Sequence, residues 1–162
     1  MIDPASAYFG AERAEGLLFI CIALVAIEIA VICWRKAGTP AAKGAAVVLV
    51  LVAAIQLVVG TTLFVRSPHD KARVTQGLQH DRAQLRGHEI ARMQQVMRNF
   101  RVYRWIEIGL LLLAALLAWR ARAGSWPRGA GVGLAPQAGL MLLFDDLAER
   151  RGELYLAWLQ GL

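Results

Sequence analysis

Cysteine is nearly absent from this sequence, which has only two cysteines among its 162 residues. Cys21 and Cys33 lie in the same apolar stretch, about 18 Å apart if that stretch is a helix. A disulfide joins Cα atoms that are roughly 4.4–6.8 Å apart, so the two cysteines cannot bridge each other. We interpret both as small apolar residues of the core.

The sequence also lacks the spaced residue sets that mark common catalytic and cofactor sites. It has no Ser-His-Asp arrangement, no phosphate-binding Walker loop and no dinucleotide-binding glycine fingerprint. His80, Gln84 and His88 would share one face of a helix, but no cysteine or third histidine completes a metal-binding set on it. These gaps predict that the chain is not an enzyme, that it needs no cofactor and that it holds no metal ion.

Charge is missing from long parts of the chain, and this is its most informative feature. Hydrophobic residues make up 57% of the sequence, and its mean hydropathy is +0.47. A helix needs about 20 apolar residues to cross a bilayer, and four stretches approach this length. We therefore predict an all-α integral membrane four-helix bundle, a single membrane domain over residues 1–162, with spans at about 17–34, 44–65, 105–119 and 129–145. Neither a basic leader nor a cleavage motif accompanies the first stretch, so we expect it to be retained.

Glycine and proline make the fourth stretch the weakest of the four predicted spans. Gly129, Gly131, Gly133 and Pro136 lie within it. Small residues allow membrane helices to approach one another closely, so these glycines favour close helix packing over a phosphate-binding loop.

The polar connection at residues 66–104 carries nine basic and three acidic residues. Apolar side chains recur in it at spacings of three and four, which predicts an amphipathic helical extension before the third span. The C-terminal residues 146–160 predict a second amphipathic helix, and Asp145, Glu149 and Glu153 repeat every four residues along it. This acidic stripe is expected to pack against the basic connection. No nucleic-acid reading motif accompanies the basic residues, so we expect no nucleic-acid partner.

Four polar side chains lie within the predicted spans: Glu28, Gln56, Glu107 and Gln137. A polar side chain at membrane depth is costly and usually faces the interior of the bundle. For Glu28 two interpretations remain open, a protonated acid that hydrogen-bonds Gln56 and a member of a proton or cation path. Glu107 has a simpler interpretation, because Arg104 stands three residues earlier and both can reach the headgroup level.

Four segments of the chain resemble a family of small bacterial four-span membrane proteins that has no assigned function. The segments are AYFGAERAEGLLF, QLVVGTTLFVRSP, EIARMQQVMRNFRVYRWIEI and LMLLFDDLAERRGELYLAWL. The resemblance implies a multi-pass protein of the bacterial inner (cytoplasmic) membrane. It also selects a block of residues for testing: Glu89, Arg92, Met93, Asn99, Phe100 and Glu107. We add Arg104 to this block.

Two classes of function remain open after the sequence has been considered. In the first, the chain is a non-catalytic interaction or accessory module that lies in the lipid bilayer and docks a membrane partner protein or a second copy. In the second, it is an oligomeric small transporter or channel in which Glu28 and Gln56 line a polar or proton path.

Overall fold

The computed structural model describes residues 4–161, so residues 1–3 and 162 of the predicted domain lie outside it. The described chain is helical and contains no strand, which confirms the all-α prediction. Its elements are α1 (Pro4–Ile32), a π-helical turn η1 (Cys33–Ala37), α2 (Pro40–His80), α3 (Arg82–Arg120) and α4 (Trp126–Gln160).

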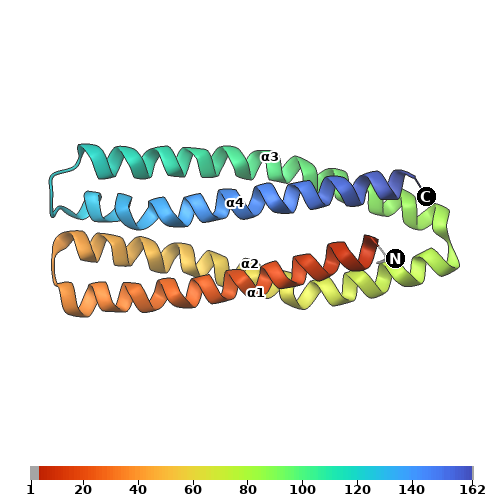
Figure 1. Cartoon of the computed structure of the whole chain (residues 1–162), viewed down its shortest axis with the longest axis horizontal. Coiled ribbons are helices and arrows are strands. Elements are labelled where there is room, and N and C mark those ends of the chain that lie inside the picture. The colour runs from red at the N-terminus through yellow and green to blue at the C-terminus, as the bar shows by residue number, and fades with distance from the viewer. Residues whose placement is uncertain (1–3, 162) are drawn as a thin grey trace.

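The four helices lie side by side, and each runs antiparallel to the next one along the chain (Figure 1). The α1–α2 and α3–α4 turns lie together at one end of the molecule, whereas the α2–α3 turn lies with both chain ends at the other. Helices α1 and α2 form one closely packed hairpin, and α3 and α4 form a second. The hairpins meet mainly through α2 and α4, while α2 and α3 touch each other little.

The turns follow from local sequence signals. Gly38 has a φ of 61°, a left-handed conformation that favours glycine, and it ends the first hairpin arm. The Thr39 side chain then caps α2 by accepting a hydrogen bond from the Ala42 backbone N–H at 3.2 Å. Asp81 caps α3 in the same way through the Gln84 N–H, at 2.9 Å.

A turn at Asp81 divides the polar connection at residues 66–104 between two helices. Helix α2 continues past the end of its apolar stretch, through Pro68, to His80, and α3 begins at Arg82. Residues 82–104 of α3 lead directly into the predicted third span, in agreement with the predicted helical extension, whereas residues 66–80 belong to α2. His80 lies on a different helix from Gln84 and His88, so these three residues do not share a helix face.

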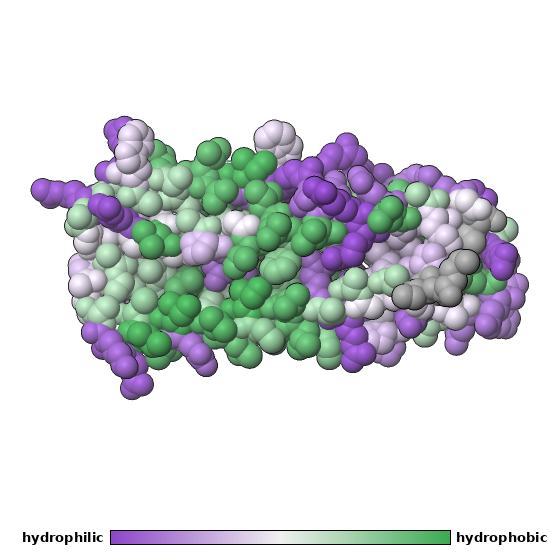
Figure 2. Space-filling model, viewed as in Figure 1, coloured by the Kyte–Doolittle hydropathy of each residue, from purple (hydrophilic) through white to green (hydrophobic). Residues whose placement is uncertain are grey.

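Three helices are long and apolar enough to cross a membrane: α1 with η1, α2 and α3. Figure 2 shows apolar side chains gathered toward the α1–α2 and α3–α4 turns and polar side chains gathered toward the chain ends. We call these parts the apolar half, which holds residues 17–34, 44–65, 105–119 and 129–145 with the two turns that join them, and the polar half, which holds residues 4–16, 66–104 and 146–161. Helix α4 is not among the three apolar helices, so the predicted fourth span is not confirmed. Its apolar stretch is rich in glycine, which contributes little hydropathy.

Glycines bring the helices of the apolar half into backbone contact. A Cβ atom at Gly16 would lie 2.7 Å from the Gly60 carbonyl oxygen, and one at Gly131 would lie 2.6 Å from the Ala114 oxygen. The close packing predicted for the glycines of α4 is therefore confirmed. Alanines fill the rest of the α1–α2 interface, including Ala23 and Ala53. The polar half has its own core of larger side chains: Phe9, Val74, Met93, Tyr155 and Leu159.

Both cysteines are free, and Cys21 is exposed on α1. The interpretation of Cys21 as a core residue is therefore wrong. Beyond Cys21, Ala23, Ala26 and Ala30 occupy the buried side of this helix, where α1 packs against α2.

Candidate functional site: an acidic cavity and an ionic core

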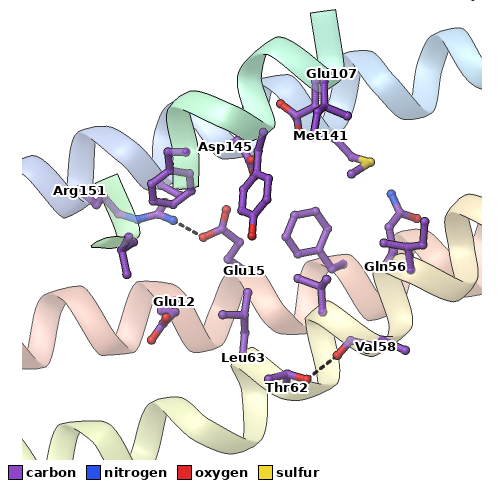
Figure 3. A pocket seen from close by; sticks show the side chains of 18 of the residues that line it. Glu12, Glu15, Gln56, Val58, Thr62, Leu63, Glu107, Met141, Asp145 and Arg151 are labelled. Atoms are coloured by element: carbon purple, nitrogen blue, oxygen red, sulfur yellow. Dashed lines mark hydrogen bonds and ion pairs between the residues drawn. The ribbon is translucent and has the colours of Figure 1, made fainter. Parts of the chain in front are cut away.

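A cavity of about 580 Å³ lies between the two hairpins, where the apolar half meets the polar half. All four helices contribute to its walls, and Figure 3 shows the polar side chains among them. This volume is within the range of small-molecule binding sites. Its acidic and basic lining residues are Glu12, Glu15, Arg66, Glu107, Asp145 and Arg151.

Both arginines of the cavity are paired with carboxylates of α1. Arg66 donates to Glu12 at 2.9 Å, and Ser67 donates to the second oxygen of Glu12 at 2.8 Å. Arg151 donates to Glu15, which is buried. Burial raises the pKa of Glu15 to about 7, because desolvation outweighs the attraction of the guanidinium. Glu15 therefore changes charge near neutral pH.

Glu107 and Asp145 form the other acidic part of the cavity, and their carboxyl groups interact across α3 and α4. Glu107 is buried, and its Oε2 atom has no hydrogen-bond partner among the described residues. The prediction that Arg104 pairs with Glu107 at the headgroup level is wrong. Arg104 instead donates to Glu149 and lies 3.6 Å from Asp146, because these acids face α3 from the polar part of α4.

Gln56 and Gln137 meet in the core of the apolar half. Gln56 donates from Nε2 to Oε1 of Gln137 at 2.9 Å, and both side chains are buried. The Oε1 atom of Gln56 also has no partner among the described residues. A buried acceptor left unpaired costs about 1–3 kcal/mol. A hydrogen-bond donor at this end of the cavity would therefore stabilise the protein.

Glu28 does not take part in this site. Its side chain is exposed on α1, and the prediction that it hydrogen-bonds Gln56 is wrong. The contact of Gly16 with Gly60 fixes the register of the two helices and sets Gln56 level with Ile20. Glu28 then lies about 12 Å further along α1, beyond the reach of the amide.

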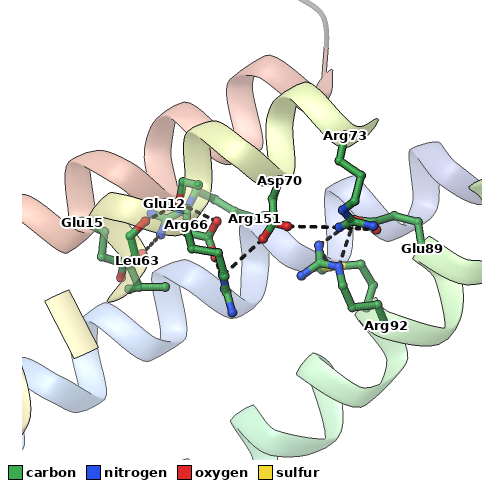
Figure 4. Close-up of polar contacts among 11 residues, drawn as sticks. Glu12, Glu15, Leu63, Arg66, Asp70, Arg73, Glu89, Arg92 and Arg151 are labelled. Carbon is green, nitrogen blue, oxygen red and sulfur yellow. Dashed lines mark hydrogen bonds and ion pairs between the residues drawn. The ribbon is translucent and has the colours of Figure 1, made fainter. Parts of the chain in front are cut away.

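A second buried cluster, the ionic core, lies in the polar half and is centred on Glu89, which is fully buried (Figure 4). Its carboxylate accepts from Arg92 at 2.6 Å and from Arg73 at 3.3 Å. The Tyr155 hydroxyl donates to the same group at 3.3 Å. Burial raises the pKa of Tyr155 above its usual range, so the hydroxyl remains a donor. The buried Glu89 carboxylate thus has two guanidinium partners and one hydroxyl partner. These contacts join α2, α3 and α4.

The other residues of the block play different parts. Met93 is buried next to the ionic core and packs with Phe9 and Tyr155. Asn99 accepts from the Gln95 side chain at 3.0 Å on the surface of α3. Phe100 lines the cavity. The block therefore does not form one site, although Glu89, Arg92 and Met93 lie together.

The predicted acidic stripe is only partly engaged with the basic connection. Glu149 contacts Arg104, but Asp145 faces the cavity and Glu153 is exposed. A repeat of four residues drifts around a helix of 3.6 residues per turn, so the three acids do not all face α3. Asp146 provides a further contact to Arg104 that the stripe did not include.

Several residues of both clusters were missed by sequence reasoning, although part of the signal was present. Glu12 and Glu15 stand three residues apart on one face of α1, as do Asp70 and Arg73 on α2. Such spacing indicates a polar face on a helix. It does not identify the helix that this face contacts. The pairing of Glu12 with Arg66, across 54 residues, depends on the fold.

The described residues contain no group of three or more histidine, cysteine or acidic side chains placed to hold a metal ion. Comparison of the chain with protein families, curated proteins and solved structures gives no match. The candidate function therefore rests on the two clusters and on the surface around them.

Proposed function

We propose that the chain is a four-span protein of the bacterial inner membrane that acts as a non-catalytic interaction module. In this proposal its apolar half anchors it in the bilayer, and the basic surface of its polar half docks an acidic partner protein. The location is supported by the three apolar helices and by the sequence resemblance. A crossing by α4 as well is supported by its place alongside α3 and α2.

The proposal rests on a surplus of basic charge on the helices of the polar half, which are held in place without a partner. Helix α2 runs on without a break for about 22 Å past Val65, and the ionic core ties it to its neighbours. Of the nine basic residues at 66–104, Arg66, Arg73, Arg92 and Arg104 form ion pairs with carboxylates. Five others are exposed and pair with no carboxylate of the described residues: Lys71, Arg82, Arg86, Arg98 and Arg101. A fixed, basic surface of this kind favours and orients an acidic partner.

The transporter hypothesis has less support from this geometry. Glu28 is exposed on the outside of α1 whereas Gln56 is buried between the helices, so the two side chains do not line one path within this chain. Polar groups extend from Glu12 through the cavity to the Gln56–Gln137 pair. Beyond that pair, toward the α1–α2 turn, alanines and glycines close the described interior. A closed end is typical of a binding cavity and not of a channel.

Cysteine labelling tests the four-span arrangement. In a variant with Cys21 and Cys33 replaced by Ser, single cysteines at the exposed positions Ala7, Gln79 and Gln160 are expected to react with a membrane-impermeant maleimide from the same side. Cysteines at Lys36 and Arg122 are expected to react only from the opposite side. Labelling of Gln79 and Gln160 from opposite sides would show that α4 does not cross the bilayer.

Photocrosslinking in living cells tests the docking surface. A photoreactive amino acid at Gln94, which is exposed among the basic residues of α3, is expected to give a discrete crosslinked protein. The same group at Leu113, which is exposed in the apolar half, serves as the control and is expected to crosslink only lipid. Charge reversal by Arg98→Glu and Arg101→Glu should abolish the Gln94 product. A product that contains a second copy of this chain would show that the basic surface mediates self-association and does not dock a different protein. Crosslinks to lipid alone would contradict the proposal.

A further inference from the structure

Two buried hydrogen-bond acceptors of the cavity have no partner among the described residues: Oε1 of Gln56 and Oε2 of Glu107. Their side chains are only 2% and 3% exposed, and both line the cavity (Figure 3). Amide and carboxylate oxygens both accept hydrogen bonds. A hydrogen-bond donor is therefore the chemical group that would satisfy both oxygen atoms.

The charge of the cavity specifies this donor further. Four carboxylates line it, against the two guanidinium groups of Arg66 and Arg151. Those guanidinium groups are already paired with Glu12 and Glu15. Glu107 and Asp145 interact with each other, and the nearby Arg104 is engaged outside the cavity with Glu149. A cationic donor would therefore meet the carboxyl groups of Glu107 and Asp145, which no guanidinium of the cavity pairs with, and its positive charge would favour their ionised form.

The wall of the cavity on the α2–α3 side is apolar and open. Ile55 and Val58 of α2 and Ile106 of α3 line it, and each is more than half exposed. Helices α2 and α3 make few contacts with each other, so the cavity opens between them. These residues lie in the apolar half, where an alkyl chain would extend into lipid.

We propose that this cavity binds an alkylammonium amphiphile. Its ammonium group donates hydrogen bonds to Glu107 and Gln56 and is balanced by Asp145, while its alkyl chain leaves between α2 and α3. An ammonium group with N–H bonds is required, because both unpaired atoms are acceptors. The site is separate from the basic surface of the polar half, so it does not depend on the proposed docking.

The test is the binding of dodecylamine to the full chain in phosphatidylcholine nanodiscs, measured by titration, with bound ligand counted by native mass spectrometry. The parent protein is expected to retain one dodecylammonium. Dodecyltrimethylammonium has the same charge and chain but no N–H donor, so it should bind at least about tenfold more weakly, as the loss of a charge-assisted hydrogen bond implies.

Glu107→Gln is expected to weaken dodecylammonium binding by at least about tenfold, by the same argument. Glu28→Gln is the matched control, since it removes an acid of the apolar half that lies outside the cavity, and it should leave binding unchanged. Val59→Trp adds bulk to the cavity wall on α2 without changing its charge and should also prevent binding, which keeps the test decisive if Glu107→Gln does not fold.

Equal binding by the parent and Glu107→Gln, or equal binding of the two amphiphiles, would overturn the proposal. Nanodiscs of phosphatidylethanolamine identify the source of the amine. Displacement of dodecylammonium by this lipid would place the amine on a lipid headgroup, and continued binding would favour a free amphiphile. Either result supports an ammonium site.

Discussion

Glu89→Leu is expected to lower the free energy of unfolding by about 3–5 kcal/mol, which is the usual cost of removing one partner from a buried ion pair. Glu89 is fully buried and is the carboxylate partner of Arg92 in this core. Leucine would leave the Arg92 guanidinium without its counter-charge and the Tyr155 hydroxyl without its acceptor. The measurement is unfolding in mixed micelles, combined with hydrogen exchange over the polar half.

Two variants separate the role of the buried charge from a general effect of losing an acid. Glu89→Gln keeps an acceptor for Tyr155 and should cost less than Glu89→Leu. Glu153→Gln changes an exposed acid of α4 and should shift the unfolding free energy by no more than about 0.5 kcal/mol. Hydrogen exchange in Glu89→Leu should increase at residues 82–104 while the apolar half stays protected. If Glu89→Leu were as stable as the parent protein, the ionic core would not hold the polar half together.

Gly129→Ala is expected to cost about 3 kcal/mol or more, at the upper end of the range for overpacked cores. A Cβ atom at Gly129 would lie 1.7 Å from the backbone oxygen of Ala41, so α4 and α2 would have to move apart. The contact is with main chain, which cannot move aside as a side chain can. Thermal unfolding in detergent and the rate of α2–α4 cysteine crosslinking both report this separation.

Gly139→Ala is the matched control, because it is the same substitution in the same helix. A Cβ atom at Gly139 would meet nothing within 4 Å. Alanine favours the helix over glycine by about 1 kcal/mol, so this variant should be slightly more stable than the parent protein. Equal losses at both glycines would show that α4 is sensitive to any added methyl group and not to its contact with α2.

The two buried clusters show where sequence reasoning reached its limit. The apolar stretches located the C-terminal half of α1 and the apolar parts of α2 and α3, because a helix that is apolar on all sides leaves a continuous compositional signal. The periodic apolar residues of 66–104 correctly indicated a helix with a buried face at Met93. The turn at Asp81 was missed, because one capping aspartate in a polar stretch is a weak signal.

The sequence by itself determined that this chain is helical, that long parts of it are apolar enough to cross a membrane and that its connection is basic. These properties depend on composition and on spacing along one helix, and both can be read locally. Only the tertiary structure decided the partners of the buried polar groups. Gln56 meets Gln137 instead of Glu28, and Arg104 meets Glu149 instead of Glu107. The physical reason is that glycine contacts such as Gly16 with Gly60 fix the rotation and register of the helices, and these long-range contacts leave no periodic trace in the sequence of either helix.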